Sequence, residues 1–174
     1  MNSVTGEHQL LNNPPTGRFI VASILVGFAL NLLPLQGVWL LAQPDFLLLT
    51  LLYWVMQRPR TVGTLSAFCA GIVMDVDSGA LLGQHALVYV LLSYLTLKFR
   101  LRVLEFPPWQ QALHVAVMLL LGQLVMVLLG LVTERVFPGY TYFIATVTGA
   151  VLWPALTRLI ELPHWQPVKP NTPT

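Results

Sequence analysis

Charged residues are scarce in this 174-residue chain: they make up 9% of it, while hydrophobic residues make up 56%. An ordinary soluble domain carries about 25% charged residues, so the scarcity excludes a water-soluble globule. Intrinsic disorder is excluded as well, because it requires low hydrophobicity and high net charge. The net charge is only +2 and no basic stripe occurs, which argues against nucleic acid as a partner. The composition therefore predicts an integral membrane protein.

Cysteine and the common catalytic motifs are almost entirely missing. Cys69 is the only cysteine, which excludes an intramolecular disulfide and a cysteine-based zinc site. The sequence has no phosphate-binding loop, no His-Glu-x-x-His pair and no Gly-x-Ser-x-Gly. Its four histidines lack metal-ligand spacing. We therefore expect a protein that is not an enzyme and needs no cofactor or metal.

Long apolar runs are what the sequence has in abundance. A spanning helix needs about 20 mostly apolar residues, and six segments are candidates: 19–35, 45–56, 61–74, 80–97, 109–132 and 140–160. The sixth contains Pro154, which membrane helices tolerate when neighbours satisfy the freed carbonyl. The sequence thus predicts an all-α membrane protein, a compact bundle of six transmembrane helices.

The second and third segments are short for a bilayer. Fourteen residues of helix, the length of the third segment, reach about 21 Å across a hydrocarbon core of about 30 Å. One alternative extends the second segment to residues 38–57, and another makes the two segments a re-entrant hairpin. We favour two short or tilted spans, because the hairpin would place Arg58 and Arg60 near the bilayer centre.

Basic residues gather on one side of the six-span arrangement. Eight share the side of both termini, against Arg135 alone on the other: Arg18, Arg58, Arg60, Lys98, Arg100, Arg102, Arg158 and Lys169. The positive-inside rule then predicts that both termini are cytoplasmic. Residues 1–17 are expected to be a disordered cytoplasmic tail, 18–161 the six-helix domain, and 162–174 a proline-rich cytoplasmic tail.

Asp75 and Asp77 form an Asp-x-Asp at the expected outer end of the third segment. Such pairs hold a metal and a sugar nucleotide in some glycosyltransferases, but this pair would face away from cytoplasmic nucleotides. We favour a helix end that runs into a solvated turn. Docking to a basic surface of a partner is the alternative.

Small residues recur every four positions before that turn, at Gly63, Ala67 and Gly71, and Asp75 continues the spacing. Such a stripe lies on one side of a helix and lets membrane helices approach closely. Packing within the molecule is favoured over a seam for a partner. Ser78 and Gly79 are then expected to turn the chain, and Gly83 to open the next helix.

Several other polar residues stand out along the apolar segments. Asp45 follows Pro44 before an apolar run, as a helix N-cap does, with partner contact as the alternative. His85, Tyr89 and Ser93 share one helix face and could line a polar cavity, although interhelical hydrogen bonding is favoured.

Two further patterns concern the longest apolar segment and the tryptophans. His114 and Gln123 are nine residues apart, about 180° around a helix, so they are not expected to face one pocket. The five tryptophans mostly lie near segment ends and are interpreted as interfacial anchors: Trp39, Trp54, Trp109, Trp153 and Trp165.

Taken together, several short motifs within residues 18–161 resemble the MreD family of rod shape-determining membrane proteins. They are Pro44-Asp45-Phe46-Leu47-Leu48, the helix end from Gly71 to Asp75, Ser78-Gly79-x-x-Leu82-Gly83, Trp109-Gln110-Gln111-Ala112 and Val151-Leu152-Trp153-Pro154. The resemblance draws attention to Pro44, Asp45, Asp75, Ser78, Gly79, Gly83 and Pro154 as partner-binding or structural positions.

The resemblance implies a location and partners. MreD proteins lie in the bacterial inner membrane, bind MreC, and act with MreB, RodA and a penicillin-binding transpeptidase in lateral peptidoglycan synthesis. No enzymatic activity is attributed to them, and their fold resembles the substrate-binding subunit of energy-coupling-factor transporters. A non-catalytic scaffold is therefore expected, with a small-molecule- or lipid-binding transporter subunit as the alternative. A lipid-modifying enzyme using Asp75 and Asp77 ranks third. A bound lipid and a homodimer are both compatible with the sequence.

Overall fold

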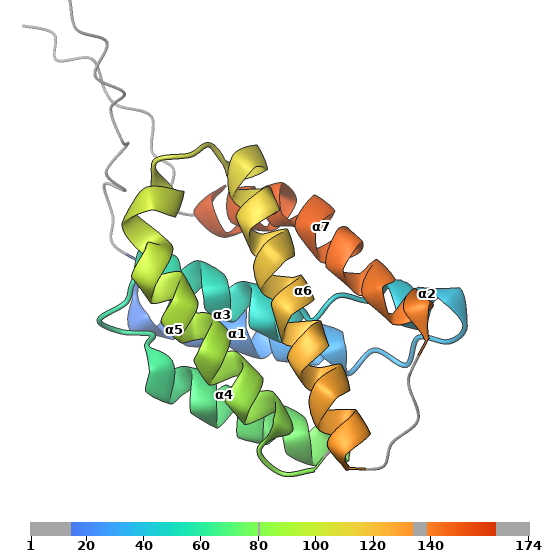
Figure 1. The fold of residues 1–174 in the computed structure, drawn as a ribbon. Coiled ribbons are helices and arrows are strands. Elements are labelled where there is room, and N and C mark those ends of the chain that lie inside the picture. Colours follow the sequence, from blue (N-terminus) through green and yellow to red (C-terminus); the bar gives the residue numbers. More distant parts are fainter. Residues whose placement is uncertain (1–14, 80, 134–138, 163–174) are drawn as a thin grey trace, which may run out of the picture.

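A computed structural model describes residues 15–79, 81–133 and 139–162, and these residues form helices and no strand. The helices are α1 (Gly17–Asn31), α2 (Val38–Ala42), α3 (Phe46–Gln57), α4 (Thr64–Ser78), α5 (Gln84–Leu104), α6 (Pro108–Val132), the 3₁₀ helix η1 (Tyr140–Phe143) and α7 (Ile144–Glu161) (Figure 1). The predicted all-α class is confirmed. The expectations for Arg135, Trp165 and most of both tails lie outside the described residues.

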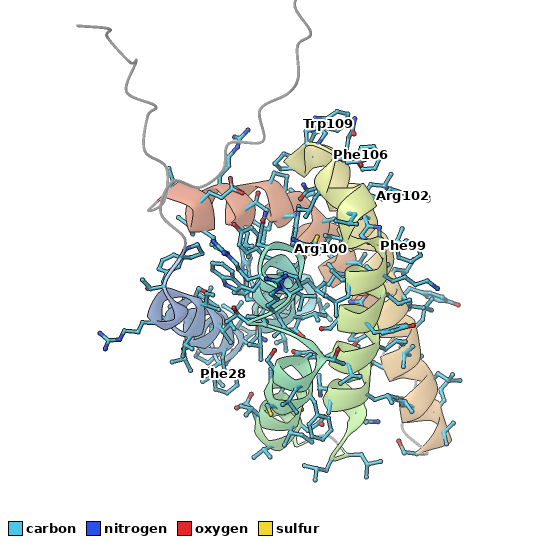
Figure 2. The ribbon with its side chains drawn as sticks, turned by 90° about the vertical axis from the view of Figure 1, so that its left-hand side faces the viewer. Phe28, Phe99, Arg100, Arg102, Phe106 and Trp109 are labelled. Atoms are coloured by element: carbon cyan, nitrogen blue, oxygen red, sulfur yellow. The ribbon has the colours of Figure 1, made fainter. Side chains whose placement is uncertain are left out.

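Helix α3 is the centre of the bundle. Its residues 47–56 are all buried, as expected of a helix that is apolar on every side. It packs against α1, α5 and α7, while α4 and α6 pack on α5 and α6 also packs on α7. In Figure 2 the teal α3 lies between the blue α1 and the green α5. The short second segment is thus surrounded by protein along most of its length.

Three stretches of the described chain are long and apolar enough to cross a membrane: Trp39–Gln57, Pro108–Val132 and Tyr140–Glu161. Helix α1 is apolar but shorter, and α4, with 15 residues, reaches only about 22 Å. These stretches support a membrane protein, while the count of six spans stays a prediction.

The stretch Trp39–Gln57 is not one continuous helix. Gln43, Pro44 and Asp45 separate α2 from α3, because proline provides no amide proton to continue the helical pattern. The break is held from both sides: the Gln43 side chain donates to the carbonyl of Leu30 at 2.9 Å, and the Thr148 hydroxyl donates to that of Ala42 at 2.6 Å. Because of the break, the first amides of α3 lie inside the bundle and have no acceptor in a preceding helical turn.

The tryptophans fall into two groups, so the general interpretation as interfacial anchors is wrong for two of them. Trp54 and Trp153 are each 1% exposed, and the Trp54 indole donates to the Ser23 hydroxyl at 2.7 Å. Trp39 and Trp109 are 75% and 68% exposed and agree with an anchoring role. Position along an apolar segment cannot separate the groups, because burial depends on which helices pack there.

The small-residue stripe packs within the molecule. Ala67, Gly71 and Asp75 are buried on α4, which packs against α5. A Cβ atom on Gly71 would lie 2.5 Å from the backbone nitrogen of Ala86 and 2.8 Å from the carbonyl carbon of His85. Since these neighbours are backbone atoms, no side chain can move aside. The expected close approach at Gly71 is therefore between the backbones of α4 and α5.

We expect Gly71→Ala to separate α4 from the start of α5 and to destabilise the protein by about 1–3 kcal/mol, the usual cost of overpacking. Gly63→Ala is the matched control, because a Cβ there meets only the Pro59 carbonyl, at an ordinary 3.6 Å. The measurement is thermal unfolding of the full-length protein in detergent. A Gly71→Ala midpoint equal to that of Gly63→Ala would contradict the close packing.

Candidate functional site

The N-terminus of α3 is held by two polar side chains. Asp45 is its N-cap and accepts the amide proton of Leu48 at 2.9 Å. Asn31, at the end of α1, accepts from the amide of Phe46 at 2.8 Å and donates to the Asp45 carboxylate at 2.8 Å. The N-cap predicted from the sequence is confirmed. Because Asn31 comes from another helix, the same bonds fix α1 against the start of α3.

The N-terminus of α5 is capped by a residue from α4. Gly83, the N-cap position, has no side chain to provide the acceptor. The Asp75 carboxylate takes its place, accepting from the amides of Gly83 and His85 at 2.7 Å each and of Ala86 at 3.4 Å. Negative charge is stabilised at this end of a helix by the free amides and the helix dipole. One carboxylate therefore caps α5 and joins it to α4.

The expectation that Asp75 is a solvated acid at a helix end is wrong. Asp75 is 1% exposed, and α4 continues to Ser78. The turn that follows contains Gly79 and Gly83 at φ values of 61° and 104°, a backbone conformation that favours glycine. This turn brings the first amides of α5 back over Asp75. Gly79 follows α4 and Gly83 precedes α5, as expected, whereas Ser78 is the last residue of α4 rather than part of the turn.

Asp77 lies apart from Asp75. It is exposed on α4, and residues two positions apart on a helix point in widely different directions. Ser78 is also exposed, and its hydroxyl donates to the Met74 carbonyl at 2.8 Å. The two carboxylates therefore do not share the arrangement that a metal-dependent glycosyltransferase would need, and only Asp77 keeps the solvated position expected of both.

A cavity of about 300 Å³ lies beside these two capped helix starts. Its polar lining residues come from four helices and the α2–α3 break: Asn31, Gln43, Asp45, His85, Tyr89, Gln123 and Tyr142. His85 and Tyr89 line it, as the cavity alternative expected, and both also contact carboxylates from outside α5, as the favoured interpretation expected. Ser93 does not line the cavity: it is fully buried one turn further along α5, and its hydroxyl has no partner among the described residues.

The polar groups around the cavity bond mainly to one another. The Tyr89 hydroxyl donates to Asp45, while the His85 ring lies 2.9 Å from the Asp75 carboxylate. On the opposite wall the Gln123 amide donates to the carbonyl of Tyr142 at 3.1 Å. Pro44 is buried beside the cavity, with Gly149 packed close to its ring. The network joins α1, α3, α4 and α5 on one side and α6 to η1 on the other.

Sequence reasoning did not identify Asn31, Gln43 or Tyr142 as members of this site. The sequence indicates a role for Asn31 only weakly, through the presence of an amide side chain near the end of an apolar segment. Its partner Asp45 is 14 residues away, beyond the range of any helical spacing. Gln123 lines the cavity and His114 does not, as their spacing predicts. Pro154 lies inside α7, where the Thr157 hydroxyl donates to its carbonyl at 2.9 Å.

The site combines two capped helix starts with a cavity. Asp45 and Asp75 accept hydrogen bonds from helix amides, and neither is paired with a nucleophilic serine or cysteine in the described residues. Apolar side chains complete the cavity lining, among them Leu48, Val88 and Leu119. The lining thus combines polar groups with apolar walls.

The helical bundle, with its three apolar stretches and buried polar network, defines an integral membrane protein without an attached soluble domain in the described residues. The family model of the rod shape-determining protein MreD matches residues 16–162, and the chain belongs to this family. The resemblance noted from the motifs is thus confirmed.

A curated relative agrees with the family match. The rod shape-determining protein MreD of Haemophilus influenzae is 28% identical over 142 residues, which cover 82% of this chain and 88% of that protein. No solved structure matches the chain, so the likeness to a transporter's substrate-binding subunit stays a prediction.

We expect Asp75→Ala to destabilise the protein by about 1–3 kcal/mol, because it leaves buried amides at the start of α5 without an acceptor. Asp77→Ala is the matched control two residues away, and its effect should stay within about 0.5 kcal/mol. Thermal unfolding in detergent measures both. Equal stability of the two variants would show that Asp75 does not cap α5.

Proposed function

We propose that this protein is a non-catalytic inner-membrane scaffold that acts with MreC to direct lateral peptidoglycan synthesis and so maintains rod shape. The observation that carries the proposal is the match of residues 16–162 to a family described as rod shape-determining. The partners that complete the machinery in this proposal are MreB, RodA and a penicillin-binding transpeptidase.

The arrangement of the polar residues supports a scaffold rather than an enzyme. The buried carboxylate of Asp75 and the capping carboxylate of Asp45 each accept several hydrogen bonds that hold helices together. Using either one as a catalytic acid or base would break a helix cap on every turnover. A rigid bundle instead suits a protein that presents a fixed surface to its partners.

The proposed orientation follows from charge. Eight basic residues share the side of the two termini, and one lies on the other side. The cavity beside Asp45 and His85 would then open towards the periplasmic side, and both tails would face the cytoplasm. In this orientation both tails of the chain are on the side where MreB filaments assemble.

A second candidate function is the binding of a small molecule or lipid, as in a transporter subunit. The cavity of about 300 Å³ favours it, because its lining combines polar groups with apolar walls. The binding function predicts that a ligand remains bound through purification and is released when the protein is denatured. A scaffold needs no such molecule.

The orientation predicts where a reporter that is active only in the cytoplasm will work. Fusions after residue 59, 103 or 174 should be active, and fusions after 78 or 137 inactive. The expectation rests on the asymmetry of basic residues. Reporter activity in cells, normalised to the amount of fusion protein, is the measurement. An active fusion after residue 78 would overturn the six-span arrangement.

The scaffold proposal predicts that depletion of the protein from a rod-shaped host gives round cells with less lateral incorporation of labelled wall precursor. It also predicts that the tagged protein retains MreC in stoichiometric amounts through purification, because an obligate scaffold must hold its partner. Complementation with Asp77→Ala, which alters only an exposed acid, is the control and should restore rods. Normal rods after full depletion would refute the proposal.

A further inference from the structure

A second hollow, of about 310 Å³, lies between the last turns of α5 and the first turns of α6, away from the cavity described above. Phe99, Arg102 and Phe106 line it from the α5 side, and Gln110, His114 and Val117 from α6. We call it the α5–α6 groove. Figure 2 shows Phe99, Arg102, Phe106 and Trp109 along the same outer edge of the bundle. The rod-shape role assigns nothing to this groove.

Two side chains in the groove have a nitrogen group without a hydrogen-bond or ion-pair partner among the described residues. Arg102 is exposed, and no hydrogen bond or ion pair from the described residues holds its guanidinium. Nε2 of His114 is buried and has no hydrogen-bond partner among the same residues. The His114 ring lies edge-on to Phe99, with ring centroids 6.1 Å apart. A buried nitrogen without a partner is uncommon in folded proteins, and a ligand in the groove would satisfy it once the ring turned.

The charged and amide side chains of the groove lie at one end of it. Arg102 and Gln110 lie near the connection between α5 and α6, beside Phe106, whereas Leu113 and Val117 lie further along α6. From Gln110 to Val117 the helix advances about 10 Å. Trp109 is largely exposed at the polar end, a position typical of the membrane–water interface. This arrangement matches a lipid with its headgroup at the interface and a chain in the hydrocarbon.

The charge at the polar end favours an anion. Residues 98–105 contain Lys98, Arg100 and Arg102 against Glu105, a net charge of +2. Arg100 is already engaged, because its Nε donates to the Met56 carbonyl at the end of α3. Lys98 is exposed on α5 but does not line the groove, so Arg102 is the cation in its lining. Guanidinium groups suit phosphate because they donate two parallel hydrogen bonds to it.

We propose that the α5–α6 groove binds one anionic phospholipid of the leaflet that faces Arg102. The Arg102 guanidinium binds the phosphate. A small rotation of the His114 ring, in the tautomer with its proton on Nε2, lets this nitrogen donate to a phosphate or ester oxygen. One acyl chain lies along Leu113 and Val117. The site is separate from the cavity beside Asp45, and it stands whether or not that cavity binds a ligand.

The test uses the full-length protein in nanodiscs or detergent, and native mass spectrometry counts the lipids that remain bound. With dioleoyl phosphatidylglycerol we expect one tightly retained lipid, and with dioleoyl phosphatidylcholine none. Arg102→Gln should weaken the retention about fivefold, the contribution of one cation near an anionic headgroup. His114→Phe keeps the ring packing against Phe99 and should weaken it as well. Removing the acid by Glu105→Gln should strengthen it.

Three controls distinguish a specific lipid site from diffuse charge attraction and from a simple anion site. Arg60→Gln removes an exposed cation elsewhere on the expected cytoplasmic side and should leave retention unchanged; a loss equal to that of Arg102→Gln would mean diffuse attraction and overturn the proposal. Asp77→Ala alters an exposed acid on α4, outside the groove, and should also have no effect. Inorganic phosphate should not displace the lipid, and displacement would show an anion site without a lipid. Equal retention of the two lipids would likewise overturn the proposal.

Discussion

The Asp75 carboxylate is the group on which most of the arrangement depends. It lies in the last turns of α4 and accepts the first free amides of α5, a helix whose own N-cap is a glycine. Helix α5 in turn packs on α3, α4 and α6. In a lipid environment, where water cannot satisfy free amides, an internal acceptor at a helix start is a strong constraint. Gly71 permits the contact, because only a residue without a side chain lets the two backbones come this close.

A second carboxylate caps the N-terminus of the central helix, α3. Asp45 caps α3, Asn31 adds an acceptor from α1, and the Tyr89 hydroxyl of α5 closes the group. The cavity lies where these helix starts come together. The candidate functional site is therefore also the place where the polar side chains hold several helices together.

The two sides of helix α6 face different environments. Gln123 faces the cavity that it shares with Tyr142, whereas His114 faces the α5–α6 groove beside Phe99. The nine-residue separation of these two side chains already required opposite faces. A single long helix thus separates a polar cavity beside capped helix starts from an amphipathic groove at the arginine-rich end of α5.

The sequence by itself determined the class and the elements. Scarce charge and repeated apolar runs indicated a helical membrane protein, and five of the six predicted segments overlap one of the helices α1, α3, α4, α5 and α6, while the sixth covers η1 and α7. Local chemistry was equally visible: Asp45 before α3, and glycines at the turn after α4, act through neighbours a few residues away. Only the tertiary structure decided which polar and aromatic residues are buried. Asp75, Trp54 and Trp153 lie within the bundle because helices distant in sequence pack over them, and a linear pattern contains no information on that contact.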